Sequence, residues 1–326
     1  MKVLLWHVHG SWTTSFVSGS HEYVLPVVAD RGPDGRGRAR TWDWPAAARE
    51  VPLERLGEEE IDVVVLQRPH EAQLLARHTG LRAGQDVPAV YLEHNAPTEH
   101  AVRSVHPVVQ DSALAGLPVV HVTRFNAMAW DCGEARTVVV DHGIPDPGPL
   151  YTGDDPSVAV VVNEPVRRWR VAGTDLVLDL ARHAPLHVYG MGTDQLAEVA
   201  AEHGAPSLVG AVHDLPQHEL HGAMARHRCY FHPYRWTSLG LSLLEAMTLG
   251  MPVLALSTTE APAAVPAEAG VVSNDLDLLR RTALRWLADP QEARDRGLAG
   301  RAHALAHYGL ERFLTDWDLI LKEVAR

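Results

Sequence analysis

The residues best suited to chemistry lie between positions 231 and 253. A strand-like apolar run ends at His232-Pro233, and a helix is predicted over residues 238–249. The first turn of such a helix offers free backbone N–H groups and the positive end of the helix dipole, which together bind phosphate. Glu245 stands about two turns into this helix among apolar neighbours, and its carboxylate is a natural hydrogen-bond acceptor for a vicinal diol. The segment therefore predicts a phosphate-binding site.

A second polar cluster follows the apolar run at 87–92, where the chain continues as Glu93-His94-Asn95. A buried strand that runs directly into charged and polar residues is typical of a functional strand end. We expect His94 and Asn95 to face a substrate. The alternative for His94 is a structural histidine whose ring nitrogens are satisfied within the protein.

Positive charge is concentrated at Arg167, Arg168 and Arg170, between a predicted strand at 157–162 and a predicted helix at 173–183. Guanidinium groups suit bidentate contacts with phosphate, so a loop carrying them could bind a phosphate group. We favour Arg168 and Arg170 slightly for this role. A solvated basic loop is the alternative interpretation.

The Gly-Leu pair at 240–241, the Leu-Glu-Ala-Met run at 244–247 and the Gly-x-Pro-Val run at 250–253 resemble the nucleotide-sugar signature of the family 4 retaining glycosyltransferases. The resemblance is most specific over residues 157–273. It implies the GT-B fold, with two facing Rossmann-like domains of parallel sheets, a shared ligand cleft and a C-terminal crossover helix. It also implies an enzyme that transfers a sugar from a nucleotide-sugar donor, with retention and without a metal.

The same resemblance implies roles for individual residues. Glu245 would bind the nucleotide ribose, and His94 would contact the donor sugar. Gly10 stands in the loop after the first strand, Gly190 at a Gly-x-Gly strand end, and Val212 in a segment that borders the base. The residues expected to bind the donor or its nucleotide are Gly10, Arg168, Arg170, Gly190, Val212, Ser238, Leu239, Gly240, Leu241 and Glu245; those expected at the reacting sugar are His94, Asn95 and Thr237.

Two positions depart from the family pattern. Thr237 stands where the family usually has a second Glu, and Ala172 stands where it has a Lys. A Thr hydroxyl still offers a hydrogen bond but no charge. The departures leave open an unusual donor sugar or reduced activity, and they motivate one alternative function, a catalytically weak nucleotide-sugar-binding subunit. A nucleotide-sugar epimerase on the same fold is a second alternative, although it needs acid/base carboxylates and Thr237 removes one of them.

The elements that must position these residues alternate between β-branched strands and helices, which predicts parallel α/β sheets with right-handed crossovers. The Pro/Gly-rich stretch at 141–156 is expected to be a linker. We therefore expect an N-terminal, acceptor-side domain over 1–145, onto which 308–326 packs, and a C-terminal donor domain over 146–307.

Composition narrows the remaining classes. The chain has 326 residues, 46% of them hydrophobic, and a net charge of -12, so it is a globular protein and a poor general binder of nucleic acid. Cys132 and Cys229 lack metal-ligand spacing, and His7 and His9 lack a third ligand, so we expect no metal and no cofactor. No apolar run near Met1 suits a signal peptide or a membrane span, which favours a cytoplasmic protein. The expected partners are the donor and an unknown acceptor: a sugar, a lipid-linked glycan or a small natural product.

Overall fold

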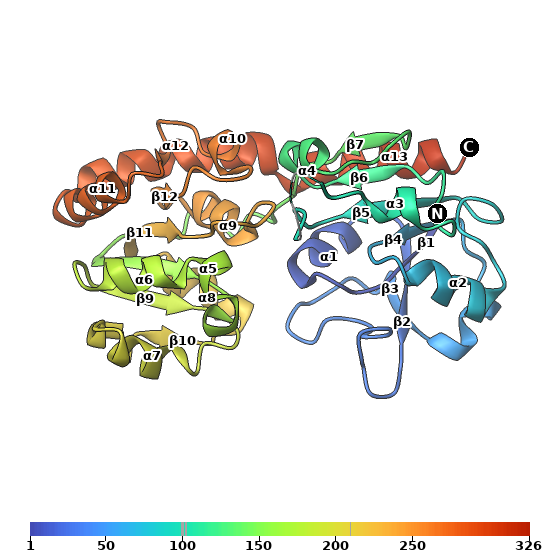
Figure 1. Cartoon of the computed structure of the whole chain (residues 1–326), viewed down its shortest axis with the longest axis horizontal. Helices are drawn as coiled ribbons and strands as arrows, with labels where there is room; N and C mark the ends of the chain where they lie inside the picture. Colours follow the sequence, from blue (N-terminus) through green and yellow to red (C-terminus); the bar gives the residue numbers. More distant parts are fainter. Residues whose placement is uncertain (99–100, 102, 209) are drawn as a thin grey trace. The chain divides into compact units, whose positions relative to one another are not determined.

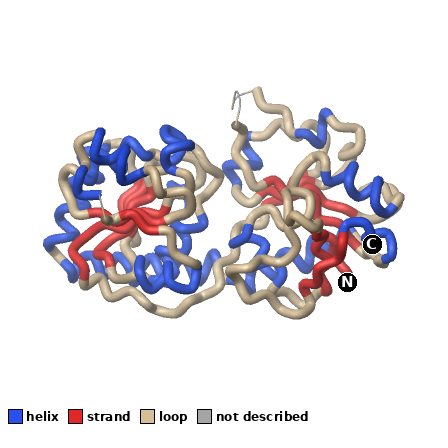
Figure 2. Tube along the Cα trace, turned by 90° about the horizontal axis from the view of Figure 1, so that it is seen from below, coloured by secondary structure: helices blue, strands red, loops and turns tan. Residues whose placement is uncertain are grey.

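The computed structural model describes residues 1–98, 101, 103–208 and 210–326, and it divides into two compact units (Figure 1). The first unit comprises Met1–Gly143 together with Leu310–Arg326, and the second comprises Ile144–Gly309. In each unit the strands lie at the centre with helices on both sides (Figure 2). The predicted α/β class with two parallel sheets is thereby confirmed.

The first unit contains a seven-stranded sheet in the order β3-β2-β1-β4-β5-β6-β7, and every neighbouring pair is parallel. Its strands are β1 (Lys2–Leu5), β2 (Glu22–Val27), β3 (Ala48–Pro52), β4 (Val63–Leu66), β5 (Ala89–Glu93), β6 (Val119–His121) and β7 (Thr137–Val139). Its helices are α1 (Gly10–Val17), the 3-10 helix η1 (Leu53–Glu58), α2 (Glu71–Thr79), α3 (Pro107–Gln110), α4 (Arg124–Ala129) and α13 (Leu310–Val324).

Helix α13 belongs to the first unit although it ends the chain. Its apolar stripe packs on α1, with the ring of Trp317 5.0 Å from Phe16 and 5.5 Å from Trp12. Gly143 makes the approach possible, because a Cβ there would lie 2.3 Å from the Cβ of Phe313. The helical tail therefore covers one face of the first sheet. The buried residues of α13 are Phe313, Trp317 and Leu321.

The second unit contains a six-stranded parallel sheet in the order β10-β9-β8-β11-β12-β13. Its strands are β8 (Asp155–Val161), β9 (Leu186–Tyr189), β10 (Val212–His213), β11 (His227–His232), β12 (Val253–Ala255) and β13 (Gly270–Val272). Its helices are α5 (Pro165–Ala172), α6 (Thr174–Ala181), α7 (Leu196–Glu202), the 3-10 helix η2 (Pro206–Leu208), α8 (Gln217–Met224), α9 (Leu241–Leu249), α10 (Ala261–Ala264), α11 (Leu276–Ala288) and α12 (Pro290–Tyr308).

Both faces of the second sheet are covered, as the nearly continuous apolar runs predict. One face packs on α6, α7 and α11, and the other on α8, α9 and α12. Helix α12 begins where Asp289 accepts hydrogen bonds from the backbone N–H groups of Gln291 and Glu292, with Pro290 at the first helical position.

Five sequence-based assignments need correction. Strands β3 and β13 were not expected. The apolar pair at 208–209 predicts a strand, but Leu208 lies in η2, and Val209 is outside the described residues. The expected basic loop between β8 and α6 is helix α5, with a kink at Trp169, whose φ of +20° and ψ of −92° are not helical. Helix α9 begins at Leu241 rather than Ser238, because Gly240 and its predecessors form a loop.

Across the residues described, no helix combines the length and the apolar character that crossing a membrane would need.

Candidate active site

The loop of residues 233–240 connects β11 to α9 and holds the start of the predicted phosphate site. Gly240 packs so tightly against the ring of His232 that a Cβ would lie 2.2 Å from Cε1, so a larger residue would displace the ring. Gly240 also has no side chain with which to cap α9. The N–H groups of the first helical turn therefore depend on other partners, and an anion is well suited to that place.

The predicted residues around this helix start contribute mainly backbone. Leu239 and Ser238 are buried, and Leu239 joins the apolar core. Leu241 is partly buried against that core, and Thr237 is half-buried. Thr237 thus keeps a hydroxyl near the surface of the loop, whereas the leucines fix the loop by burial.

Glu245 is buried on α9, with 7% of its surface exposed. It lies against α8, where the side-chain amide of Gln217 donates to Oε1 at 3.4 Å and Nε2 of His221 lies 3.7 Å from Oε2. Nε2 of Gln217 also lies 3.0 Å from Nε2 of His221. A buried carboxylate with two long contacts is held in place and retains acceptor capacity for further hydrogen bonds.

The arginines of α5 differ in their surroundings. The guanidinium of Arg168 lies over the ring of Tyr234, 5.3 Å from its centroid. Arg170 pairs with Asp175 at 2.7 Å, and Arg167 pairs with Glu164. The side chains of Arg167 and Arg170 are both largely exposed, so Arg168 is the one held against the loop that precedes α9.

Arg235 was not singled out from the sequence, although it stands in the same loop. Its guanidinium makes two hydrogen bonds with Asp175, at 2.6 and 2.8 Å, and its backbone N–H donates to the carbonyl of Val171 at 3.0 Å. Burial opposes ionisation of Asp175, but the hydrogen bonds from Arg235 and the charges of Arg235 and Arg170 together outweigh it and lower the pKa of Asp175. The pair joins the start of α6 to the loop before α9.

Gly173 brings these two segments into contact. It has a φ of +74°, and a Cβ there would lie 2.0 Å from the carbonyl oxygen of Pro233. Glycine is therefore required both by the backbone conformation and by the close approach. The structure thus gathers Arg168, Arg235 and the start of α9 in one part of the second unit.

Gly190 directly follows β9, and Val212 lies on the neighbouring strand β10. Gly190 has a φ of +142°, and a Cβ would meet the carbonyl oxygen of Val162 at 2.2 Å. Its N–H donates to the carbonyl of His213, and Val212 pairs with Val188. The Val212 side chain packs on the apolar core, so its contribution to a binding site would come from the backbone.

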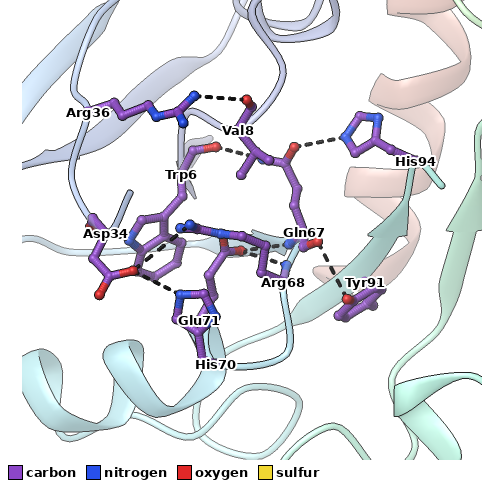
Figure 3. A network of polar contacts seen from close by, with 10 residues as sticks. All are labelled: Trp6, Val8, Asp34, Arg36, Gln67, Arg68, His70, Glu71, Tyr91 and His94. Atoms are coloured by element: carbon purple, nitrogen blue, oxygen red, sulfur yellow. Dashed lines mark hydrogen bonds and ion pairs between the residues drawn. The ribbon is translucent and has the colours of Figure 1, made fainter. Parts of the chain in front are cut away.

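In the first unit, His94 follows β5 and points toward Gln67, which follows β4 (Figure 3). Nε2 of His94 lies 2.8 Å from Oε1 of Gln67, while the Gln67 amide nitrogen donates to the carbonyl of Trp6 at 2.6 Å. Because the amide nitrogen is occupied by a carbonyl, Oε1 is the acceptor and His94 carries its proton on Nε2. Nδ1 of His94 is then a hydrogen-bond acceptor.

Burial keeps the His94 ring neutral. Desolvation lowers its pKa well below the ordinary value, and the neighbouring His9 and His142 act in the same direction. The rings of His9 and Trp12 lie 4.2 and 5.1 Å from that of His94. A neutral imidazole with a fixed tautomer can accept a hydrogen bond from a hydroxyl group.

A buried carboxylate fixes the turn that carries Gln67. Glu71 accepts hydrogen bonds from the backbone N–H of Gln67 at 2.6 Å and from Nε of Arg68 at 2.7 Å (Figure 3). Burial raises the pKa of Glu71. Gln67 and Glu71 were not expected from the sequence, because Gln67 acts through Trp6 and His94, which follow other strands, and Glu71 acts through Gln67.

Asn95 and Gly10 lie near the ends of β5 and β1. The side chain of Asn95 is exposed, and its backbone N–H is held by the carboxylate of Glu93 at 2.6 Å. Gly10 begins α1, and a Cβ there would meet the Trp42 indole at 2.7 Å. Close packing against Trp42 is thus one reason for a glycine at this position.

Comparison with known proteins bears on these segments. Residues 169–303 match the family model of glycosyl transferases group 1, and no curated protein sequence matches the chain. Among solved structures, the chain is similar to sucrose-phosphate synthase from Thermosynechococcus elongatus, with 14% identity over 99% of this chain and 98% of that one and a TM-score of 0.72. It is also similar to HepE of Anabaena, solved with UDP-glucose (13% identity, 99% and 100% of the chains, TM-score 0.72), and to a glycosyltransferase of Rickettsia africae (12%, 100% and 98%, TM-score 0.65).

Proposed function

This chain is a glycosyltransferase of the GT-B fold, and its residues 169–303 match the group 1 glycosyl transferases. From this premise we propose that it transfers a sugar from a UDP-sugar to an acceptor yet to be identified. The observation that carries the proposal is the start of α9: a helix without a capping side chain, next to Arg168 and Arg235, with the buried carboxylate of Glu245 in the same helix. This set offers partners for the diphosphate and the ribose of a nucleotide.

The donor diphosphate binds at Gly240 and the first turn of α9 in this proposal. Arg168 and Arg170 of α5 supply positive charge, with Arg235 as a third cation. They take the role of the family's lysine, whose position is occupied by Ala172 in this chain. Glu245 accepts hydrogen bonds from the ribose, and backbone at Gly190 and Val212 borders the base. Residues 146–307 form the donor domain, and residues 1–145 with 308–326 form the acceptor-side domain.

His94 orients the donor sugar through Nδ1, its unprotonated nitrogen, with Asn95 and Thr237 also at the reacting sugar. Retention of configuration is proposed from the resemblance to the family. The leaving phosphate, stabilised by the helix start and the arginines, then accepts the proton of the acceptor hydroxyl. The similar Anabaena protein was solved in complex with UDP-glucose, so UDP-sugars are the first donors to test. We also propose a cytoplasmic location, since both cysteines are free.

The deciding experiment is calorimetric titration of the protein with UDP and with UDP-, GDP-, ADP- and dTDP-sugars. We expect one class of donor to bind, and Glu245→Gln to weaken it by about 10- to 100-fold, because a hydrogen bond to a charged group contributes about 1.5–3 kcal/mol. Glu219→Gln makes the same chemical change at an exposed carboxylate on α8 and should leave affinity unchanged. Full affinity in Glu245→Gln would refute the ribose assignment.

The alternative functions are separated by following the bound donor. With donor alone, an epimerase yields an altered nucleotide sugar, which NMR detects directly. Binding without turnover across a broad acceptor panel would instead indicate a nucleotide-sugar-binding subunit, as the replacements at Thr237 and Ala172 allow. We expect donor consumption that depends on an acceptor.

A further inference from the structure

A group of metal-ligating side chains gathers on one face of the second sheet, on strands β8, β9 and β11. Asp155, His187 and His227 each offer one ligand atom, and these atoms all lie within 4.8 Å of one another. Nδ1 of His227 is 3.5 Å from a carboxylate oxygen of Asp155, and the rings of His187 and His227 are 4.7 Å apart. The donor set is two imidazoles and a carboxylate.

A third histidine adjoins this set. Nε2 of His213, on β10, lies 3.1 Å from Nδ1 of His187, and the two rings are stacked. Four strands that are neighbours in the order β10-β9-β8-β11 thus contribute one ligand each. The ligand atoms that lie within 4.8 Å of one another are those of Asp155, His187 and His227, and His213 adjoins them through His187. Two imidazoles and a carboxylate suit Zn²⁺, and His213 is placed to become a fourth ligand of a tetrahedral site.

The sheet explains why the rings can meet. β8 lies between β9 and β11, and it carries a small residue, Ser157, in the region between the two histidine side chains. The Ser157 hydroxyl lies 2.6 Å from Nδ1 of His227. Small residues on a central strand leave room for larger side chains from both neighbouring strands.

Tyr189 fixes the orientation of the His227 ring. Its hydroxyl is 2.6 Å from Nε2 of His227. When the Nε2–H group of His227 donates a hydrogen bond to the Tyr189 oxygen, Nδ1 is unprotonated and faces the Ser157 hydroxyl and the Asp155 carboxylate. Metal-bound histidines usually donate their other ring N–H to an oxygen in this way, which sets the tautomer and the ring direction.

We propose that Asp155, His187, His213 and His227 bind a single Zn²⁺ ion that ties together the four strands. Asp155, His187 and His213 are half-buried, so an ion can reach the site from solvent, whereas His227 is buried. Asp155 and His227 lie at the amino ends of β8 and β11, away from the carboxyl ends that lead into the donor loops, whereas His213 follows Val212 and accepts the N–H of Gly190 at its carbonyl. The ion therefore has a structural role in the sheet, and its His213 side adjoins the segment assigned to the base.

Two features weigh against tight binding and shape the test. His187 and His213 are joined by a hydrogen bond, as are His227 and Ser157, and the exposed Arg226 lies close enough to His227 to disfavour positive charge there. The carboxylate of Asp155 offsets part of the charge of the ion. Arg226→Gln should therefore raise metal affinity.

The test uses the full, tag-free chain, stripped with a chelator and titrated with Co²⁺ as a spectroscopic probe and then with Zn²⁺. We expect one Co²⁺ per chain with the intense visible absorption of a tetrahedral N/O site, displaced by one equivalent of Zn²⁺. Asp155→Asn and His187→Gln change half-buried side chains and should each weaken binding at least about 10- to 100-fold.

The matched control is a close histidine pair away from this site, His303 and His307 on α12, whose rings are 4.3 Å apart. The double variant His303→Gln/His307→Gln should keep the absorption band. Absence of the band in the wild-type chain, its survival in Asp155→Asn and His187→Gln, or its loss in the α12 variant would each overturn the proposal. Thermal unfolding of every metal-free variant establishes that the fold is intact.

Discussion

His94 combines two properties that suit contact with a sugar hydroxyl. Its Nε2 proton is directed to Gln67, whose amide is itself fixed by the carbonyl of Trp6, and burial keeps the ring neutral. The tautomer thus follows from a chain of hydrogen bonds that starts at the end of β1. The position of Gln67 is thus explained by its role in orienting His94, and no contact of Gln67 with substrate is needed to explain it.

Replacement of His94 by Ala should lower turnover of the donor sugar by about 10- to 100-fold, since it leaves a hydroxyl of the bound donor without its partner. UDP alone should bind as before, because the nucleotide is assigned to the second unit. Gln67→Leu should cause a smaller loss, mainly in kcat, because the ring remains but loses its orientation.

Steady-state kinetics and calorimetry with UDP measure the two effects separately. His70→Ala is the control, since this half-exposed histidine of the same network contacts Asp34 rather than His94 (Figure 3). An equal loss of UDP affinity in His94→Ala would show that the residue supports the fold or the nucleotide, and not the sugar.

At the scale of elements, the junction of α5 and α6 is joined to the loop before α9. The contacts are the Arg235–Asp175 pair, the Arg235 backbone bond to Val171 and the approach of Gly173 to Pro233. Residues about 60 positions apart in the chain are thereby held in register. The cations assigned to the diphosphate depend on this junction for their positions.

Gly173→Ala should cost about 3 kcal/mol of unfolding free energy, because the residue has positive φ and its Cβ would enter the Pro233 carbonyl. Gly204→Ala is the matched control: it has a φ of +72°, but its nearest neighbour is Nε of Arg182 at 3.8 Å, so we expect about 1 kcal/mol. Urea unfolding measures both. Equal losses would mean that the close approach contributes nothing.

Local patterns predicted most of the long elements, because strands such as β4 and β5 are uninterrupted apolar runs. β3 was missed because Arg49 and Glu50 break its apolar pattern at the sheet edge, where charged side chains are tolerated. Helix α5 was expected to be a loop because it is short, begins at Pro165 and is followed by Gly173, residues that are also common in loops. The partners of His94 and Gly173 lie in distant segments, so no local signal could identify them.

At the scale of the whole molecule, histidines are buried in both units. Desolvation by burial lowers the pKa of His9 and His121 to about 4 and that of His142 and His232 to about 3. Nδ1 of His142 also has no hydrogen-bond partner within the described residues. These rings are neutral in the folded chain, whereas the unfolded chain protonates them near pH 6.5.

The folded chain should therefore lose stability in acid well before its carboxylates titrate. A folded-state pKa below the unfolded value leaves stability unaffected above about pH 6.5 and reduces it as the pH falls toward about 4, because unfolding then takes up protons. Each such histidine contributes about 1.4 kcal/mol per pH unit within that window.

Urea unfolding at pH 7, 6 and 5, with chelator present, gives the slope of the unfolding free energy against pH. His142→Gln should reduce the slope of the unfolding free energy against pH by the contribution of about one proton. His218→Gln should leave the slope unchanged, because the His218 side chain is exposed in the folded chain. A free energy of unfolding that stays constant from pH 7 to 5 would contradict burial of neutral histidines as the source of acid sensitivity.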